Sequence, residues 1–308
     1  MRYPSLMLRL PQNTALRAGL LMVCAMGSFV CNDTIVKIVG AHLPVGELIA
    51  LRGVMAMTIL TAICASQGLL KDLPRIRQKN VLMRSTCDLF ATVAFVTALV
   101  HMPIANLTSV MQAVPLAVAL LSMLFLGEEV GWRRMIAIIG GFIGVLMIVK
   151  PSVSNFSVYE VLALAIVLFV AVRDLLTKTI PARIPVFVIA LANAGFVTVG
   201  GLALMLFQGF VRPEAWQVGL LALAACFLSS GYLLMVATLR LGELTGTAPF
   251  RYSVMIFAII SGILVFGEFP DWIAILGMVL IVVCGLYAAH REARRSKALS
   301  DSAEMPAP

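Results

Sequence analysis

Among the charged side chains within long apolar stretches of this chain, five are candidates for a functional role: Asp33, Arg52, Asp88, Asp174 and Arg251. An ionisable side chain inside a membrane span costs about 2.5–3.5 kcal/mol on insertion scales, so it marks a pathway or a structural ion pair. At ~1.5 Å per helical residue, Asp33 and Arg52 fall at one level near one end of their segments, where Glu47 could join them. The other three fall toward the opposite end. We therefore predict two charged groups, each able to close one side of a pathway.

Static ion pairs are the alternative for part of this set. Asp33 with Lys37, and Asp174 with Lys178, are spaced i,i+4 near segment ends, a spacing that favours local pairing on a helix. Arg173 lies next to Asp174 and points to a different face. Arg52 and Arg251 have no acidic residue three or four positions away. For these two arginines the sequence favours a role in gating.

Uncharged polar residues indicate a cavity between the segments. Ser85, Asp88 and Thr92 form one stripe at helical spacing. Single polar residues also serve as interhelical hydrogen-bond partners, and this is the alternative for each one taken alone. Taken as a set they favour a cavity, and the candidate substrate or gate residues are Asp33, Arg52, Asp88, Asn106, Gln112, Asp174, Asn193, Tyr232, Arg251 and Tyr252.

The composition identifies the elements that must position these residues. The 308 residues are 61% hydrophobic and 12% charged, with a mean hydropathy of +1.02, so lipid is the expected solvent. Segments of about 20 apolar residues can span a bilayer as helices. We predict an all-α membrane protein with ten transmembrane helices, at 16–39, 46–66, 81–101, 104–126, 132–150, 157–178, 184–208, 215–239, 244–266 and 270–289.

The basic residues indicate topology. Most Lys and Arg fall on alternate links that begin with the N-terminus, so the positive-inside rule predicts a multi-pass protein of the inner (cytoplasmic) membrane with both termini in the cytoplasm. The net charge of +8 therefore does not indicate a nucleic-acid partner. The six cysteines lie in apolar segments without paired spacing, which predicts no disulfide, metal site or cofactor.

The chain also repeats itself at an offset of about 140 residues. Asp33 and Lys37 align with Asp174 and Lys178, and Gly127-Glu128 aligns with Gly267-Glu268. Five segments per copy is an odd number, so the copies enter the membrane from opposite sides, as in many secondary transporters. This predicts two inverted five-helix repeats, at 16–150 and 157–289, flanked by a cytoplasmic N-terminus (1–15) and a basic, disordered tail (290–308).

Two features should interrupt or tighten the helices. Pro115 and Pro249 each remove a helical hydrogen bond within a span and permit a kink. The spacing Gly140-x-x-x-Gly144, with Gly277 and Gly285 in the tenth segment, is typical of close helix packing.

Repeat length, helix count and the Gly-Glu turn after each fourth segment resemble the EamA family of the drug/metabolite transporter superfamily. The resemblance covers residues 16–290 and implies a transporter of small organic metabolites. Asn32-Asp33-Thr34-x-x-Lys37, Leu43-Pro44 and Leu51-Arg52-Gly53 are similar to the opening of bacterial riboflavin and S-adenosylmethionine transporters of that family. This implies a solute with an aromatic or heterocyclic part.

The predicted function is a secondary carrier that works by alternating access, and riboflavin uptake is the favoured activity. Its alternatives are export of amino acids, S-adenosylmethionine-like metabolites or drugs, and an intramembrane enzyme. Asn32-Asp33 lacks the second acidic residue of a magnesium-binding prenyltransferase motif, since position 36 is Val, and no Walker-type loop is present. Small solutes and membrane lipids are the expected partners. The sequence favours neither import nor export, and neither proton coupling nor exchange.

Overall fold

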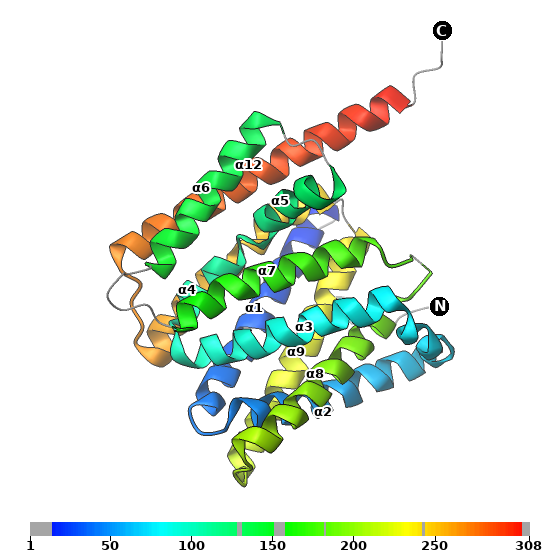
Figure 1. Ribbon diagram of the computed structural model, residues 1–308, viewed down its shortest axis with the longest axis vertical. Coiled ribbons are helices and arrows are strands. Elements are labelled where there is room, and N and C mark those ends of the chain that lie inside the picture. The colour runs from blue at the N-terminus through cyan, green and yellow to red at the C-terminus, as the bar shows by residue number, and fades with distance from the viewer. Residues whose placement is uncertain (1–13, 128–130, 151–157, 182, 242–243, 304–308) are drawn as a thin grey trace.

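The computed structural model describes residues 14–127, 131–150, 158–181, 183–241 and 244–303. Over these ranges all regular secondary structure is helical and no strand occurs, as the sequence predicts (Figure 1). The first half forms α1 (Thr14–Gly40), α2 (Val45–Ser66), the 3₁₀ helix η1 (Leu69–Arg77), α3 (Lys79–His101), α4 (Ile104–Met111), α5 (Val114–Leu126) and α6 (Trp132–Val149).

The second half forms α7 (Val158–Lys178), α8 (Val186–Gln208), α9 (Ala215–Leu241), α10 (Leu244–Arg251), α11 (Ser253–Ser261), the π-helical turn η2 (Gly262–Phe266) and α12 (Trp272–Ala303). Each of the ten predicted segments coincides with one helix or with one interrupted helix. Since α12 continues to Ala303, it also includes much of the segment predicted as a disordered tail.

The two interruptions lie beside the prolines. Helix α4 ends at Met111 and α5 starts at Val114, so Pro115 stands in the first turn of the new helix. Pro249 lies within α10, which ends at Arg251 just before the break at Tyr252. A proline in a first turn lacks only a donor that a helix start leaves unpaired, so the break before Pro115 is the expected response. Pro249 instead removes a hydrogen bond within α10, which ends two residues later.

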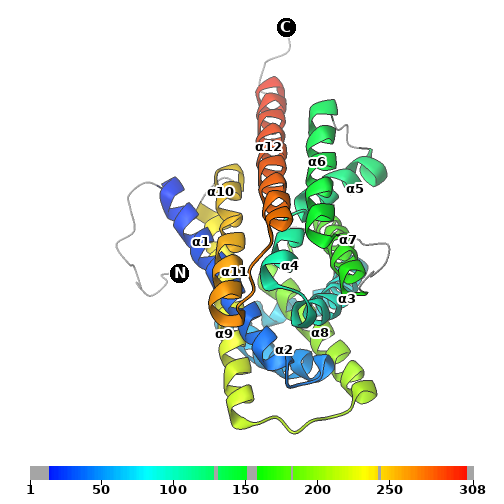
Figure 2. The ribbon, with the colours of Figure 1, turned by 90° about the vertical axis from the view of Figure 1, so that its left-hand side faces the viewer.

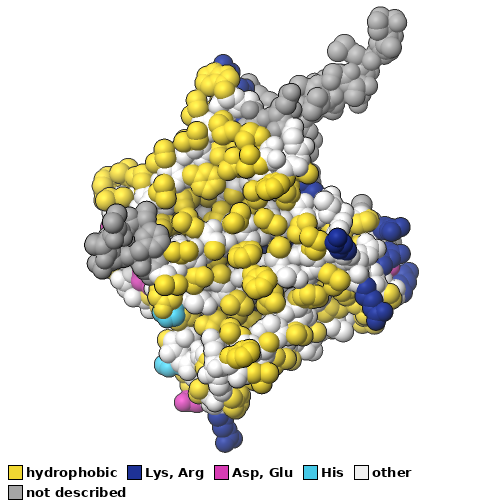
Figure 3. Space-filling model, viewed as in Figure 1, with side chains coloured by type: hydrophobic (Ala, Val, Ile, Leu, Met, Phe, Trp, Pro, Cys, Tyr) yellow, Lys and Arg dark blue, Asp and Glu magenta, His cyan; other side chains and the backbone are white. Residues whose placement is uncertain are grey.

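Nine helical segments of the described chain are long and apolar enough to cross a membrane, so this is a multi-pass membrane protein. Helix α7 is not among them although it has 21 residues, because it carries Glu160, Arg173, Asp174 and Lys178. Within the bundle, α7 packs against α3 and α5. Hydrophobic side chains cover most of the face shown in Figure 3, and Lys and Arg gather at its edge.

Helices of the first half pair with helices of the second half. The largest packing partners are α1 with α9, α2 with α8, α3 with α7, and α6 with α12. The start of α1 and the end of α12 lie on one side of the bundle, which we name the terminal side (Figure 2). The opposite side, where α1, α3, α6 and α8 end, is the distal side.

Glycine permits the close contact of α6 with α12, which run side by side in Figures 1 and 2. A Cβ added to Gly277 would lie 2.6 Å from the Gly144 carbonyl oxygen, and one added to Gly144 would lie 2.8 Å from that of Gly277. The predicted close packing at these glycines is confirmed.

We expect Gly277→Ala to push α6 away from α12 and to lower the stability of the purified protein by about 1–3 kcal/mol, the usual cost of overpacking. Thermal unfolding in detergent measures this. Gly219→Ala in α9 is the matched control, because no atom lies within 4 Å of its added Cβ. An equal loss in the control would contradict the packing argument.

Candidate functional site

An arginine on α7 joins two helices in the middle of the bundle. Arg173 donates from Nη1 to Asp88 of α3 at 2.6 Å, and from Nη2 to Asp174 at 2.8 Å. The side chains of Arg173 and Asp88 are 24% and 12% exposed, so this ion pair is largely removed from solvent. The structure thus brings Asp88 and Asp174 together, as the sequence predicts, but through an arginine whose role the sequence left ambiguous.

Two further residues of α3 make polar contacts with α7 and α8. Arg84 donates from Nε to the Thr177 hydroxyl at 2.8 Å, and Ser85 donates to the Asn193 Oδ1 atom at 2.8 Å. Ser85 and Asn193 are buried. The pairing of Asn193 with Ser85 satisfies both groups.

A second group of charges lies on α1 and α2. The buried Arg52 donates from Nη1 to the Asn32 amide oxygen at 3.3 Å, and Asn32 donates from its amide nitrogen to Asp33 at 2.9 Å. Asp33 and Arg52 attract each other electrostatically, but they form no direct ion pair within 4 Å. Asn32 therefore separates the two charges that the sequence places at one level.

Tyr232 of α9 connects the two groups. It is within range of electrostatic interaction with Arg52 and with Arg84, Asp88 and Arg173. Its ring meets the Phe29 ring edge-on, with centroids 5.5 Å apart. Tyr232 keeps 41% of its surface exposed although charged groups of α2, α3 and α7 surround it, so the interior beside it is incompletely filled.

These residues form one set, which we name the central network: Asn32, Asp33, Arg52, Arg84, Ser85, Asp88, Arg173, Asp174, Asn193 and Tyr232. It joins α1, α2 and α3 of the first half to α7, α8 and α9 of the second. Six of the ten candidate site residues belong to it. A buried region that holds both signs of charge beside an aromatic ring can bind a polar, charged organic molecule.

A further ion pair, which we name the distal contact, joins the two halves on the distal side. Lys37 of α1 is 2.5 Å from Glu268, which follows η2, and also donates to the Met102 carbonyl oxygen at 2.6 Å. The second oxygen of Glu268 accepts from the Ile104 amide at 3.0 Å. Lys37 therefore pairs across the halves and not with Asp33 in its own helix.

Other residues reinforce this side. Lys150, at the end of α6, pairs with Asp271, which caps α12 by accepting from the Ala274 amide at 2.8 Å. Glu47, suggested by the sequence as a third member of the Asp33 group, is fully buried and accepts from the Val211 amide at 3.0 Å. It ties α2 to the link between α8 and α9, away from Arg52.

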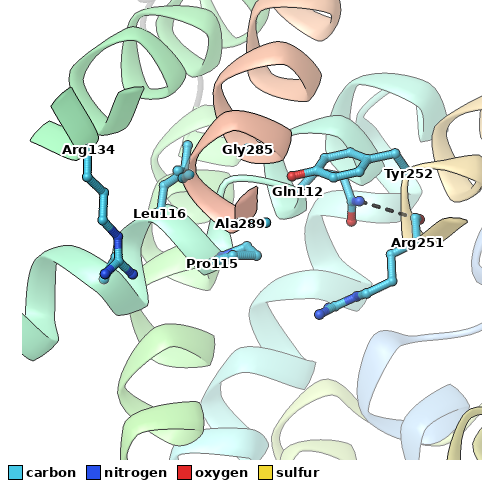
Figure 4. Close-up of a pocket in the computed structure, with 10 residues that line it drawn as sticks. Gln112, Pro115, Leu116, Arg134, Arg251, Tyr252, Gly285 and Ala289 are labelled. Carbon is cyan, nitrogen blue, oxygen red and sulfur yellow. Dashed lines mark hydrogen bonds between the residues drawn. The ribbon is translucent and has the colours of Figure 1, made fainter. Parts of the chain in front are cut away.

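Three of the four remaining predicted residues line a pocket between α5, α6, α10 and α12 (Figure 4). Gln112 and Tyr252 line it with Arg251, and the Gln112 amide donates to the Arg251 backbone oxygen at 3.5 Å. Arg134, Gly285 and apolar side chains complete the wall, and the cavity measures about 190 Å³. Arg251 is thus placed in this terminal-side pocket and not beside Asp88. Asn106 belongs neither to this pocket nor to the central network, and its buried Oδ1 atom has no hydrogen-bond partner among the residues that the structure describes.

The sequence did not identify the bridging role of Arg173 or the partner of Lys37. Both pairs join helices far apart in the chain. The one sequence signal for the pairing of Lys37 with Glu268 was the alignment of Gly-Glu turns and lysines between the two copies. Glu128, the counterpart of Glu268, lies outside the described residues. Within the described part of the chain no cluster of three metal-ligating side chains occurs.

Comparison with known proteins gives one family across nearly the whole chain. The model of the EamA-like transporter family matches twice, at residues 16–150 and 157–288. A solved crystal structure superposes on 90% of this chain and 98% of its own with a TM-score of 0.62 at 18% identity, which shows a shared fold.

The curated relatives are all named as transporters. An S-adenosylmethionine uptake transporter of Rickettsia conorii is 26% identical, covering 85% of this chain and 88% of its own. The Pseudopaline exporter CntI of Pseudomonas aeruginosa is 29% identical and covers 87% and 94%. A riboflavin transporter of Rhizobium johnstonii is 27% identical, and the match covers 66% of this chain and 68% of the relative. With a family model that matches both halves, this chain belongs to the EamA-like transporter family.

Proposed function

We propose that this protein is a secondary carrier that moves a zwitterionic, heterocyclic metabolite of the S-adenosylmethionine type across the bacterial inner membrane. The observation that carries the proposal is the central network, in which six helices from both halves surround acids, arginines and a partly exposed aromatic ring. A carrier needs such a site at the junction of its two halves.

In this proposal α7 is the sixth of ten spans, and the chain forms two inverted five-helix repeats. The charges of α7 are compatible with a span because Arg173 and Asp174 pair with each other and with Asp88 inside the bundle. The terminal side faces the cytoplasm. The distal contact and the terminal-side pocket are then the proposed outer and cytoplasmic ends of the pathway, which alternating access opens in turn.

The charges of the network favour the S-adenosylmethionine type of substrate. That molecule carries an ammonium group, a carboxylate, a sulfonium centre and an adenine ring. The acids can pair with the ammonium and sulfonium groups, the arginines can pair with the carboxylate, and the Phe29–Tyr232 ring pair can stack on the adenine. Riboflavin, the substrate favoured from the sequence, is the second candidate. It could stack on the aromatic pair, but it is uncharged and so offers no counter-charge to Asp33 or Arg52.

Radiolabelled S-adenosylmethionine and riboflavin, supplied to separate cultures of cells expressing the chain, test this proposal. Saturable uptake of the first compound, lost in Arg52→Ala at equal membrane levels of protein, supports it. Saturable uptake of riboflavin alone would replace the substrate. No transport of either compound in either direction, with the protein present in the membrane, would contradict it.

The terminal-side pocket is the proposed opening to the cytoplasm, and one glycine keeps it open. A Cβ added at Gly285 would overlap the Tyr252 hydroxyl. We expect Gly285→Val to displace Tyr252 into the pocket and to reduce transport at least about tenfold, the effect of a barrier raised by about 1.4 kcal/mol. Initial uptake rates measure this. Gly219→Ala, with open space at its Cβ, is the control, and unchanged transport by Gly285→Val would exclude this route.

A further inference from the structure

Two charges of the central network have unused hydrogen-bonding capacity. Among the described residues, the Arg52 guanidinium makes one hydrogen bond, to Asn32 at 3.3 Å, although it has five N–H donors. The Asp33 carboxylate likewise accepts one hydrogen bond in the described structure, from Asn32 at 2.9 Å. A buried arginine and a half-buried acid that attract each other would be expected to pair directly. Here the Asn32 side chain stands between them.

The corresponding positions of the second half are different. By the repeat, Asp33 aligns with Asp174 and Arg52 with Asn193. Asp174 is paired with Arg173 at 2.8 Å, and Asn193 accepts from Ser85 at 2.8 Å. Both polar groups of the second half therefore have partners within the protein. Of these aligned positions, those of the first half hold an acid and an arginine that are both available to a ligand.

We propose that Asp33 and Arg52 form a subsite for the head group of an α-amino acid, and this inference rests on the proposed function. Asp33 accepts hydrogen bonds from the ammonium group, and Arg52 donates to the carboxylate through its free N–H groups. An α-amino acid carries both groups on one carbon, so a single ligand can replace the direct ion pair that Asn32 prevents. Asn32 is the positioning residue that holds the two charges apart.

The neighbouring aromatic pair gives the ligand its direction. Phe29 precedes Asp33 by four residues, so it lies about 6 Å along the same face of α1 toward the terminal side. Its ring contacts Tyr232, whose surface remains 41% exposed. With its head group at Asp33 and Arg52, the heterocycle of the ligand extends toward these rings and toward the terminal-side pocket.

The experiment measures binding to the purified full-length protein in detergent by equilibrium dialysis. The probes are S-adenosylmethionine, its decarboxylated form, which keeps the amino group, and 5′-methylthioadenosine, which lacks both. For the wild-type protein, loss of the carboxylate weakens binding by about 10- to 100-fold, as expected for hydrogen bonds to charged groups. Loss of the ammonium group, which in 5′-methylthioadenosine accompanies loss of the sulfonium charge, weakens it by at least as much again.

Variants assign each charge to its residue. Arg52→Gln weakens S-adenosylmethionine binding to the level of the decarboxylated compound and leaves that compound unaffected. Asp33→Asn weakens both amino compounds equally and leaves 5′-methylthioadenosine unaffected. Arg52→Lys keeps the charge and gives an intermediate loss, which guards against a folding defect in Arg52→Gln. Arg77→Gln, at an exposed arginine of η1, is the matched control and binds as the wild type does.

The outcomes separate this inference from the proposed function. The subsite is overturned if the wild-type protein binds all three probes with equal affinity, or if both variants distinguish the probes as the wild type does. In that case, transport of S-adenosylmethionine would still support the carrier function. Failure of the wild-type protein to bind or transport any of the three probes overturns both. The crossed pattern of losses described above supports the subsite.

Discussion

Replacing Arg173 with alanine is expected to abolish transport and to lower the stability of the protein by about 3 kcal/mol, the lower end of the cost of breaking a buried ion pair. The change leaves Asp88, whose side chain is 12% exposed, as an uncompensated charge between α3 and α7. Asp174 is 39% exposed and so adds less to this cost. Substrate uptake and thermal unfolding in detergent measure the two effects.

A neutral pair tests whether charge or shape matters at this position. Asp88→Asn combined with Arg173→Gln removes one acid and the arginine together, so it should recover most of the stability lost in Arg173→Ala. Lys150→Ala is the matched control. The side chains of Lys150 and Asp271 are 39% and 54% exposed, so their ion pair contributes at most about 1 kcal/mol to stability. A stability loss no larger in Arg173→Ala than in Lys150→Ala would contradict the bridging role.

Replacing Lys37 with alanine is expected to open the distal side. The change leaves Glu268 without its cation and frees the Met102 carbonyl oxygen, so the link from α1 to the end of η2 is lost. Ser261 reports on this opening, because its hydroxyl lies 2.6 Å from that of Thr34 at the α1–α11 contact. A cysteine at position 261, in a chain whose six native cysteines are replaced by alanine, should react at least about tenfold faster with a membrane-impermeant thiol reagent applied from the distal side. That rate corresponds to a closed state destabilised by about 1.4 kcal/mol.

Lys150→Ala is again the control for this experiment. It also breaks a distal ion pair, but the contact between Gly144 and Gly277 still holds α6 against α12. Its labelling rate should stay at the wild-type value. Equal acceleration in both variants would show that the distal contact has no special role in closure.

The helices could be predicted from the sequence because their length and hydropathy are set by the bilayer. The predicted segment 104–126 coincides with α4 and α5, and Pro115 marked the place of its break. The end of α12 was misjudged because helix formation continues beyond the apolar residues. Hydropathy marks a span and does not mark where a helix ends.

The site could be predicted only in part. Depth along the helices correctly brought Asp33 near Arg52 and Asp88 near Asp174. The intervening Asn32 and the placement of Arg251 in a separate pocket depend on how helices rotate about their axes. A one-dimensional sequence does not fix that rotation. The pairing of Lys37 with Glu268 likewise depends on α1 packing against the second half of the chain.

Counterflow in proteoliposomes tests the carrier proposal most directly. Vesicles that contain the purified chain are loaded with unlabelled S-adenosylmethionine and diluted into trace labelled compound, with no ion gradient or nucleotide. We predict that label accumulates transiently above its equilibrium level, because one site must face each side in turn and return loaded. Label that only equilibrates, or that enters no faster than into protein-free vesicles, would contradict a carrier of this substrate.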